Sequence, residues 1–195
     1  GTAVRRHAHK WEESPLPIIV HVMADRPEET ALMVESLEGV ENVMAVELGF
    51  APLLTDDIIL TSLKMALGEL PLIVLLPSEQ AISLAPRVIE AGAAAVSLAA
   101  PRGSLNIPPG SDELITGRLY GPGLFPQSLE TVRRLAGAGM PVIGGGGIYK
   151  QEQVDVMKEA GAMAVQLDAV LWHGGFNTDS DADPNPPASN SELLI

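Results

Sequence analysis

The stretch PVIGGGGIYK, residues 141–150, decides the fold class of this chain. It reads as a short apolar strand that runs into four consecutive glycines, and a polar helix over about 150–160 follows. A second apolar strand, MAVQL at 163–167, comes directly after that helix. A strand, a helix and a strand in this order are typical of a parallel α/β sheet.

The same alternation extends back through the chain to residue 17. We predict apolar strands at 17–23, 43–48, 71–76, 94–99, 141–144 and 163–167. We predict helices from Pro27 to about residue 38, from a Thr55 cap to about 67, up to 92, from Pro126 to about 138, and over 150–160. Pro86 suits the first turn of the third helix with Ser83 as its cap, although an earlier start with a kink is the alternative. Residues 101–125, rich in glycine and proline, are predicted as a long loop.

Six parallel strands with helices between them predict a TIM-barrel type (β/α)8 fold that is incomplete in this chain. A closed barrel of this type has eight strands and typically about 250 residues, so two strands are expected to be missing at the N-terminus. The chain also begins with Gly1, from which we expect a fragment, a cleaved protein or a gene that has lost its first units. We divide it into an N-terminal segment (1–16), a barrel domain (17–172) and a disordered acidic tail (173–195).

Composition excludes several classes of function. The chain has 195 residues and no cysteine, which excludes disulfides, thiolate metal sites and a cysteine nucleophile. A net charge of −13 disfavours binding to nucleic acid or anionic membranes. No apolar run is long enough to span a bilayer, and residues 1–13 lack the apolar core of a signal peptide, so a cytoplasmic location is expected by default.

The glycine run is the strongest indication of a binding site. Glycines at the carboxyl end of a parallel strand let the backbone approach a ligand, and the next helix directs free N–H groups toward it. A phosphate-bearing or other small ligand is the natural occupant. The alternative is that the glycines only let the strand pass tightly into the helix.

Few side chains are candidates for catalysis. His21 lies within a strand and Glu47 ends one, so both are weak catalytic candidates. A buried or barrel-mouth histidine and a structural hydrogen-bonding carboxylate are the alternatives. Asp168 is expected to cap the last helix rather than to act as an acid. His7 and His9 are too few ligands for a metal site, and no metal is expected.

Several segments, in order, resemble the dihydroorotate dehydrogenase family of FMN-dependent α/β barrels. The similarity covers about residues 16–172 and rests on PIIV (17–20), VEL (46–48), EAGA (90–93), GRLYGP (117–122), PVIGGGGI (141–148) and GAMAVQ (161–166). The resemblance implies FMN as the cofactor. It implies cofactor binding by Gly121, Gly145, Gly146, Gly147, Gln166, Asp168 and Ala169.

The polar groups that the family uses on its substrate are absent. Gly49 and Leu53 stand where the family has asparagines, Ala51 stands at the base position, and Leu75 replaces a lysine. Ala99 and Ala100 replace Asn-Thr, and Asp168 brings a carboxylate to the phosphate end. An alanine cannot accept a proton, so no oxidation of dihydroorotate is expected.

Three functions remain open from the sequence. The first is a dihydroorotate dehydrogenase-like, FMN-dependent oxidoreductase with a degenerate substrate site. The second is a catalytically silent barrel homologue that acts as a binding or structural subunit. The third is a phosphate-binding barrel isomerase or lyase that uses Glu47, His21 or Asp25. An exposed first strand also favours self-association, unless residues 1–16 with Trp11 cover it.

Overall fold

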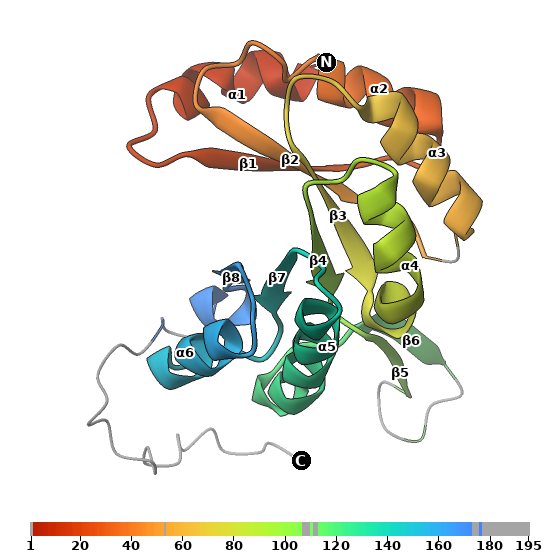
Figure 1. The fold of residues 1–195 in the computed structure, drawn as a ribbon, viewed down its shortest axis with the longest axis vertical. Helices are drawn as coiled ribbons and strands as arrows, with labels where there is room; N and C mark the ends of the chain where they lie inside the picture. Colours follow the sequence, from red (N-terminus) through yellow and green to blue (C-terminus); the bar gives the residue numbers. More distant parts are fainter. Residues whose placement is uncertain (1, 53, 107–109, 111–112, 173–175, 177–195) are drawn as a thin grey trace.

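The computed structural model of the chain describes residues 2–52, 54–106, 110, 113–172 and 176. Its centre is a six-stranded parallel sheet, which curls into a half-barrel with helices along its outer side (Figure 1). In spatial order the strands are β1 (Ile18–Met23), β2 (Val43–Gly49), β3 (Leu72–Pro77), β4 (Ala95–Ala99), β7 (Val142–Gly145) and β8 (Ala164–Gln166). The mixed α/β class and the six parallel strands predicted from the sequence are confirmed.

Five helices follow the strands along the chain. They are α2 (Pro27–Glu35), α3 (Asp56–Ala66), α4 (Ser78–Glu90), α5 (Phe125–Gly137) and α6 (Gln151–Glu159). Short 3-10 turns lie at Pro122–Leu124 and Ala169–Trp172. An N-terminal helix, α1 (Thr2–Glu12), precedes the sheet and was not expected from the sequence.

The sheet separates two apolar layers because alternate side chains of a strand point to opposite faces. The outward residues Val46, Val74 and Val96 are completely buried in the main core under the helices. On the concave face Ala45, Ile73 and Ala95 form a second, smaller cluster, against which Ile143 packs. Closer to the carboxyl ends of the strands, the positions on the concave face do not form a continuous apolar layer. The polar side chains of the sheet gather there.

Both ends of the sheet keep an edge. Within the described residues β1 pairs only with β2, and β8 pairs only with β7. On the concave side of β1, Ile19 and Met23 are 55% and 49% exposed. Helix α1 packs against the core through Val4 and Trp11 rather than adding a strand to β1.

A single side chain fastens the segment after α1. The Asn42 Nδ2 donates to the carbonyl oxygens of Trp11 (3.0 Å), Ser14 (3.1 Å) and Leu16 (2.8 Å). Asn42 has a φ of 67°, a left-handed conformation that asparagine tolerates better than most residues. Trp11 is therefore partly buried and held at the entry to β1, but self-association through the edge stays a prediction.

The predicted loop over 101–125 is wrong in part. It contains an antiparallel hairpin of β5 (Arg102–Asn106) and β6 (Leu114–Arg118). Ser104 and Thr116 face each other in this hairpin, with their hydroxyl oxygens 2.9 Å apart. The glycines and prolines around the strands hid this pairing because their composition is typical of loops.

The preferred start of the third helix is also wrong. Helix α4 begins at Ser78, and Pro86 lies inside it, as in the alternative with an earlier start. Ser83 is an interior residue whose hydroxyl donates to the Gln80 carbonyl. The helix tolerates Pro86 because Ala81, Leu84, Ala85 and Val88 are fully buried on its inner face, and this packing offsets the lost hydrogen bond.

The acidic tail predicted over 173–195 lies outside the described residues, except for Phe176, which packs against the core. In the part of the chain that the structure describes, no helix is long and apolar enough to cross a membrane.

Candidate functional site

The carboxyl ends of the strands surround a cavity of about 250 Å³ on the concave face. Polar side chains reach it from β1, β2, β6 and the segment after β8, and the glycine turn after β7 forms part of its wall. The polar and glycine positions of its lining are His21, Glu47, Arg118, Tyr120, Gly145, Gly146, Gln166 and Asp168. Six of these residues were site candidates from the sequence: His21, Glu47, Gly145, Gly146, Gln166 and Asp168.

A chain of hydrogen bonds crosses the floor of this cavity. The parallel register places His21 of β1 directly beside Glu47 of β2. His21 Nδ1 lies 2.7 Å from Glu47 Oε2, and the Ser97 hydroxyl donates to Glu47 Oε1 at 2.6 Å. Ser97 is completely buried, whereas the side chain of His21 is 40% exposed. The buried end of the chain is therefore fixed, and the imidazole is the end that meets solvent and ligand.

Glu47 is ionised at neutral pH. Its burial alone would raise the pKa of the carboxyl, but the hydrogen bonds from His21 and Ser97 and the positive charge of His21 and Arg118 hold that pKa below its ordinary value of 4.5. An ionised carboxylate can only accept hydrogen bonds, so Nδ1 of His21 carries the proton between the two residues. This assignment leaves Nε2 of His21 without a hydrogen-bond partner in the described part of the chain, and in the neutral tautomer of the ring that nitrogen is an acceptor.

Gly49 makes room for the imidazole. A Cβ atom at this position would lie 2.5 Å from His21 Nε2 and would also overlap Cε1. Ordinary van der Waals contact begins at 3.4 Å, so no side chain fits beside the ring in this position. Gly49 and the position of the His21 ring are thus parts of one arrangement.

The glycine turn is explained largely by packing. A Cβ on Gly144 would overlap the Met157 side chain, and one on Gly147 would overlap the backbone of Phe125. Gly146, at a φ of 95°, lies against the Ser128 hydroxyl, and Gly147 has a φ of 74°. The alternative interpretation, that the glycines only allow a tight connection from strand to helix, therefore accounts for Gly144, Gly146 and Gly147. Gly145 alone has ordinary space for a Cβ atom.

Four of the seven predicted cofactor residues line the cavity, and Gly121, Gly147 and Ala169 do not. Gly121 and Gly147 are neighbours, since a Cβ on Gly147 would come 3.1 Å from the Gly121 carbonyl oxygen. Neither glycine lines the cavity. Ala169 is buried behind the wall. Asp25, on the loop after β1, is also absent from the lining.

The phosphate end does not fit the phosphate of FMN. Asp168 lines the cavity, and its Oδ1 accepts from the Ala169 backbone N–H. In the part of the chain that the structure describes, the expected last helix is seen as a 3-10 turn over Ala169–Trp172. At the start of α6, the N–H groups of Tyr149 and Lys150 already donate to Gln153 Oε1 at 2.7 and 3.1 Å. A phosphate dianion would meet a carboxylate and occupied donors.

Sequence reasoning missed Ser97 and undervalued Arg118. Ser97 is a polar residue at an inward position of an otherwise apolar strand, and this exception was a usable signal. In the sequence Arg118 stood out only as part of GRLYGP (117–122), whereas in the structure it borders the cavity.

The comparisons with known proteins give no assignment. No protein-family model matches the chain, and no curated protein matches it. Among the described residues there is no group of three or more histidine, cysteine, aspartate or glutamate side chains that could hold a metal ion. His7 instead stacks on Trp11, with ring centroids 6.1 Å apart.

Proposed function

We propose that this chain is a divergent, TIM-type relative of the dihydroorotate dehydrogenase family that transfers a proton on a small anionic substrate. In this proposal His21 is the acid/base group, Glu47 orients it, and Arg118 binds the negative charge of the substrate. The reaction class is a proton shift of the isomerase type, next to a carbonyl or carboxylate group.

One observation carries the proposal: a buried carboxylate holds Nδ1 of a histidine whose other nitrogen is free at the cavity. This arrangement keeps the imidazole in one tautomer and stabilises the imidazolium that forms when Nε2 accepts a proton. In the reaction, Nε2 takes a proton from a carbon of the substrate and returns it to a neighbouring atom. Nothing is oxidised, and the proton count balances without a co-reactant.

The size and charge of the cavity favour a small monoanion. Its volume of about 250 Å³ is at or below the usual range for ligand sites. Arg118 supplies one positive charge, while Asp168 at the other wall opposes a second negative charge on the ligand. A short carboxylate meets these conditions better than a phosphate monoester does.

The experiment is deuterium exchange on simple 2-oxo acids. Pyruvate and 2-oxobutanoate are incubated with the chain in D2O, and loss of their C3 proton signals is followed by NMR. We expect exchange faster than in buffer, and a loss of about 10²–10⁴-fold in His21→Asn. His9→Asn is the matched control because His9 is an exposed histidine on α1. No acceleration by the unmodified chain, or equal rates in the two variants, would refute the proposal.

The second candidate is the family's own activity, an FMN-dependent oxidoreductase. It is favoured by Gly145, Gly146 and Gln166, which line the cavity where the resemblance expects the cofactor phosphate. Asp168 and the occupied N–H groups of Tyr149 and Lys150, just before α6, weigh against it, so no step through flavin is derived. Absorbance and fluorescence titration with FMN tests it directly, and a chain that neither exchanges protons nor binds FMN would be the catalytically silent homologue.

A further inference from the structure

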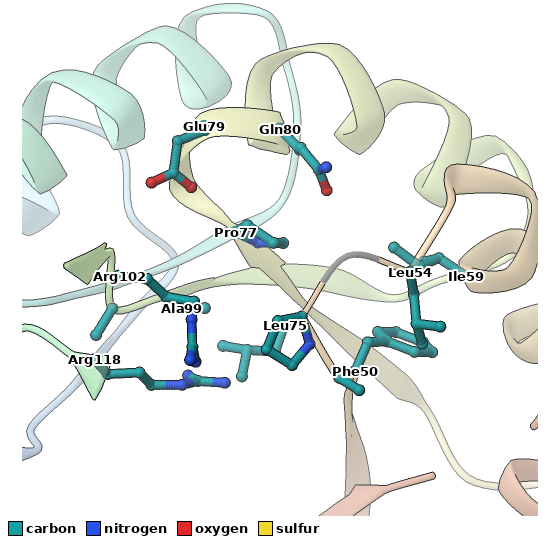
Figure 2. A pocket seen from close by; sticks show the side chains of 13 residues that line it. Phe50, Leu54, Ile59, Leu75, Pro77, Glu79, Gln80, Ala99, Arg102 and Arg118 are labelled. Carbon is teal, nitrogen blue, oxygen red and sulfur yellow. The ribbon is translucent and has the colours of Figure 1, made fainter. Parts of the chain in front are cut away.

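A second cavity, of about 280 Å³, adjoins the first one beneath the hairpin (Figure 2). It lies between the segment after β2, the start of α4 and the hairpin strands β5 and β6. Leu75, Ala99, Ala100 and Arg118 border both cavities, so the two spaces meet along the ends of β3 and β4.

One side of the second cavity is apolar. Phe50 and Ile59 are buried, and Leu54, Leu75 and Pro77 are partly buried at its wall. Figure 2 shows Phe50, Leu54 and Ile59 grouped on one side, with Leu75 between them and the arginines. This wall suits a short hydrocarbon chain or a small ring.

The other side carries two positive charges, of which the one on Arg118 also lowers the pKa of Glu47 in the first cavity. Arg102 and Arg118 are directly opposite each other in the antiparallel register of the hairpin. Their guanidinium ends converge beside Leu75 (Figure 2), and neither arginine has an ion-pair partner within the described residues. Like charges directly opposite each other destabilise an antiparallel pair, so an anion between them removes a cost that the free protein bears.

The only carboxylate in the described lining lies away from the arginines. Glu79, in the first turn of α4, borders the cavity but forms no ion pair with Arg102 or Arg118. A ligand carboxylate is therefore repelled from the α4 wall and attracted to the hairpin wall. The charges therefore select a negatively charged ligand and also fix the direction in which an elongated ligand lies in the cavity.

We infer that the second cavity binds an apolar monocarboxylate, with its hydrocarbon body among Phe50, Leu54 and Leu75 and its carboxylate between Arg102 and Arg118. Two guanidinium groups are well matched to the two oxygens of one carboxylate. Since Arg118 borders both cavities, the carboxylate end lies at their junction and faces the site of His21. The inference concerns binding only, and it does not require the proposed proton transfer.

The test measures the affinity of hexanoate by isothermal titration calorimetry and by amide shifts of Ala99 and Ala100 in NMR spectra. Acetate lacks the apolar body, and hexanamide lacks the charge. We expect saturable hexanoate binding below about 10 mM, and at least about tenfold weaker binding of both comparison compounds. Equal affinity for hexanamide, or no saturation with hexanoate, would overturn the inference without any variant.

Two variants separate the charge from the shape. Arg102→Met is expected to weaken hexanoate binding by about tenfold or more, whereas Arg133→Met removes an exposed arginine of α5 and is expected to change it less than about twofold. Ala51→Trp fills the apolar end and is expected to abolish binding. Equal effects of the two arginine variants, or full affinity in Ala51→Trp, would contradict the assignment.

The proposed binding site and the proposed function can be refuted independently of each other. His21 borders only the first cavity, so His21→Asn is expected to abolish proton exchange and to keep hexanoate affinity within about twofold. Proton exchange without hexanoate binding would refute only the inference, and hexanoate binding without exchange would refute only the proposed function.

Discussion

The substitution Gly49→Ala tests the arrangement of His21 with a single methyl group. The new Cβ would lie 2.5 Å from His21 Nε2, where ordinary contact begins at 3.4 Å, so the ring must move by roughly 0.9 Å or change rotamer. A shift of this size along the 2.7 Å bond between Nδ1 and Glu47 Oε2 lengthens it to about 3.6 Å, which is no longer a hydrogen bond. Glu47 then keeps only Ser97 as a donor.

The free energy of folding that Gly49→Ala loses depends on how exposed the hydrogen bond between His21 and Glu47 is. A hydrogen bond to a charged group contributes about 1.5–3 kcal/mol, and the 40% exposure of the His21 side chain places this one at the lower end. Alanine also recovers about 0.5 kcal/mol relative to glycine in a strand, since Gly49 does not have a positive φ. The net loss of folding free energy is about 1 kcal/mol.

Two measurements on the same variant check this reasoning. Urea denaturation gives the change in free energy of unfolding, and imidazole ¹⁵N shifts report whether the proton stays on Nδ1. Gly137→Ala is the matched control, because a Cβ there meets nothing within 4 Å and the position is not left-handed. Unchanged stability together with an unchanged tautomer in Gly49→Ala would refute the claim that this glycine makes room for the ring.

Three further predictions concern the pH response, the cofactor and the substrate. Because the pKa of Glu47 is lowered in the folded state, the ionised carboxylate stabilises the fold above pH 4.5, and this contribution is lost as the pH falls through the lowered pKa. Between pH 7 and pH 3, the urea midpoint of Glu47→Gln should therefore fall less steeply than the midpoint of the exposed control Glu35→Gln. FMN should bind negligibly to the unmodified chain, and Asp168→Gly should bind it about tenfold to hundredfold more tightly. Fluorescence titration measures both affinities, and tight binding by the unmodified chain would show that Asp168 does not block the site. No flavin-dependent oxidation of dihydroorotate is expected, because Ala51 and Leu75 stand where the dihydroorotate dehydrogenase family, which the sequence resembles, has its base and its lysine. Measurable turnover with added FMN would contradict this.

The sequence predicted the sheet well because its strands are nearly continuous apolar runs. Residues 72–74 and 95–98 are buried on both faces, and burial of this kind leaves little ambiguity about a strand. The start of α4 and the hairpin were missed because Pro86 and the glycines near Arg102 favour other local structures, which tertiary packing and cross-strand pairing override. Local propensity therefore failed where long-range contacts decide.

The site was predicted only as separate residues. His21 and Glu47 were both named, but their contact depends on the register of two strands that are 26 residues apart in sequence. Gly49 was interpreted as the loss of a functional asparagine, and only the atomic positions show that a side chain there would displace the imidazole. The pairing of Arg102 with Arg118 required the hairpin, which the sequence did not reveal.

The order of the strands has a consequence for how such a gene can change. From β1 to β4 each strand lies beside its successor in the chain, and β7 and β8 continue the series. A strand–helix unit gained or lost at either end of the sheet would alter one strand interface and leave the remaining pairings in place. The hairpin shows a second route to novelty, since it is inserted between β4 and β7 without separating them. Evolution can therefore add binding groups to this architecture by insertion, while the inherited sheet is copied unchanged.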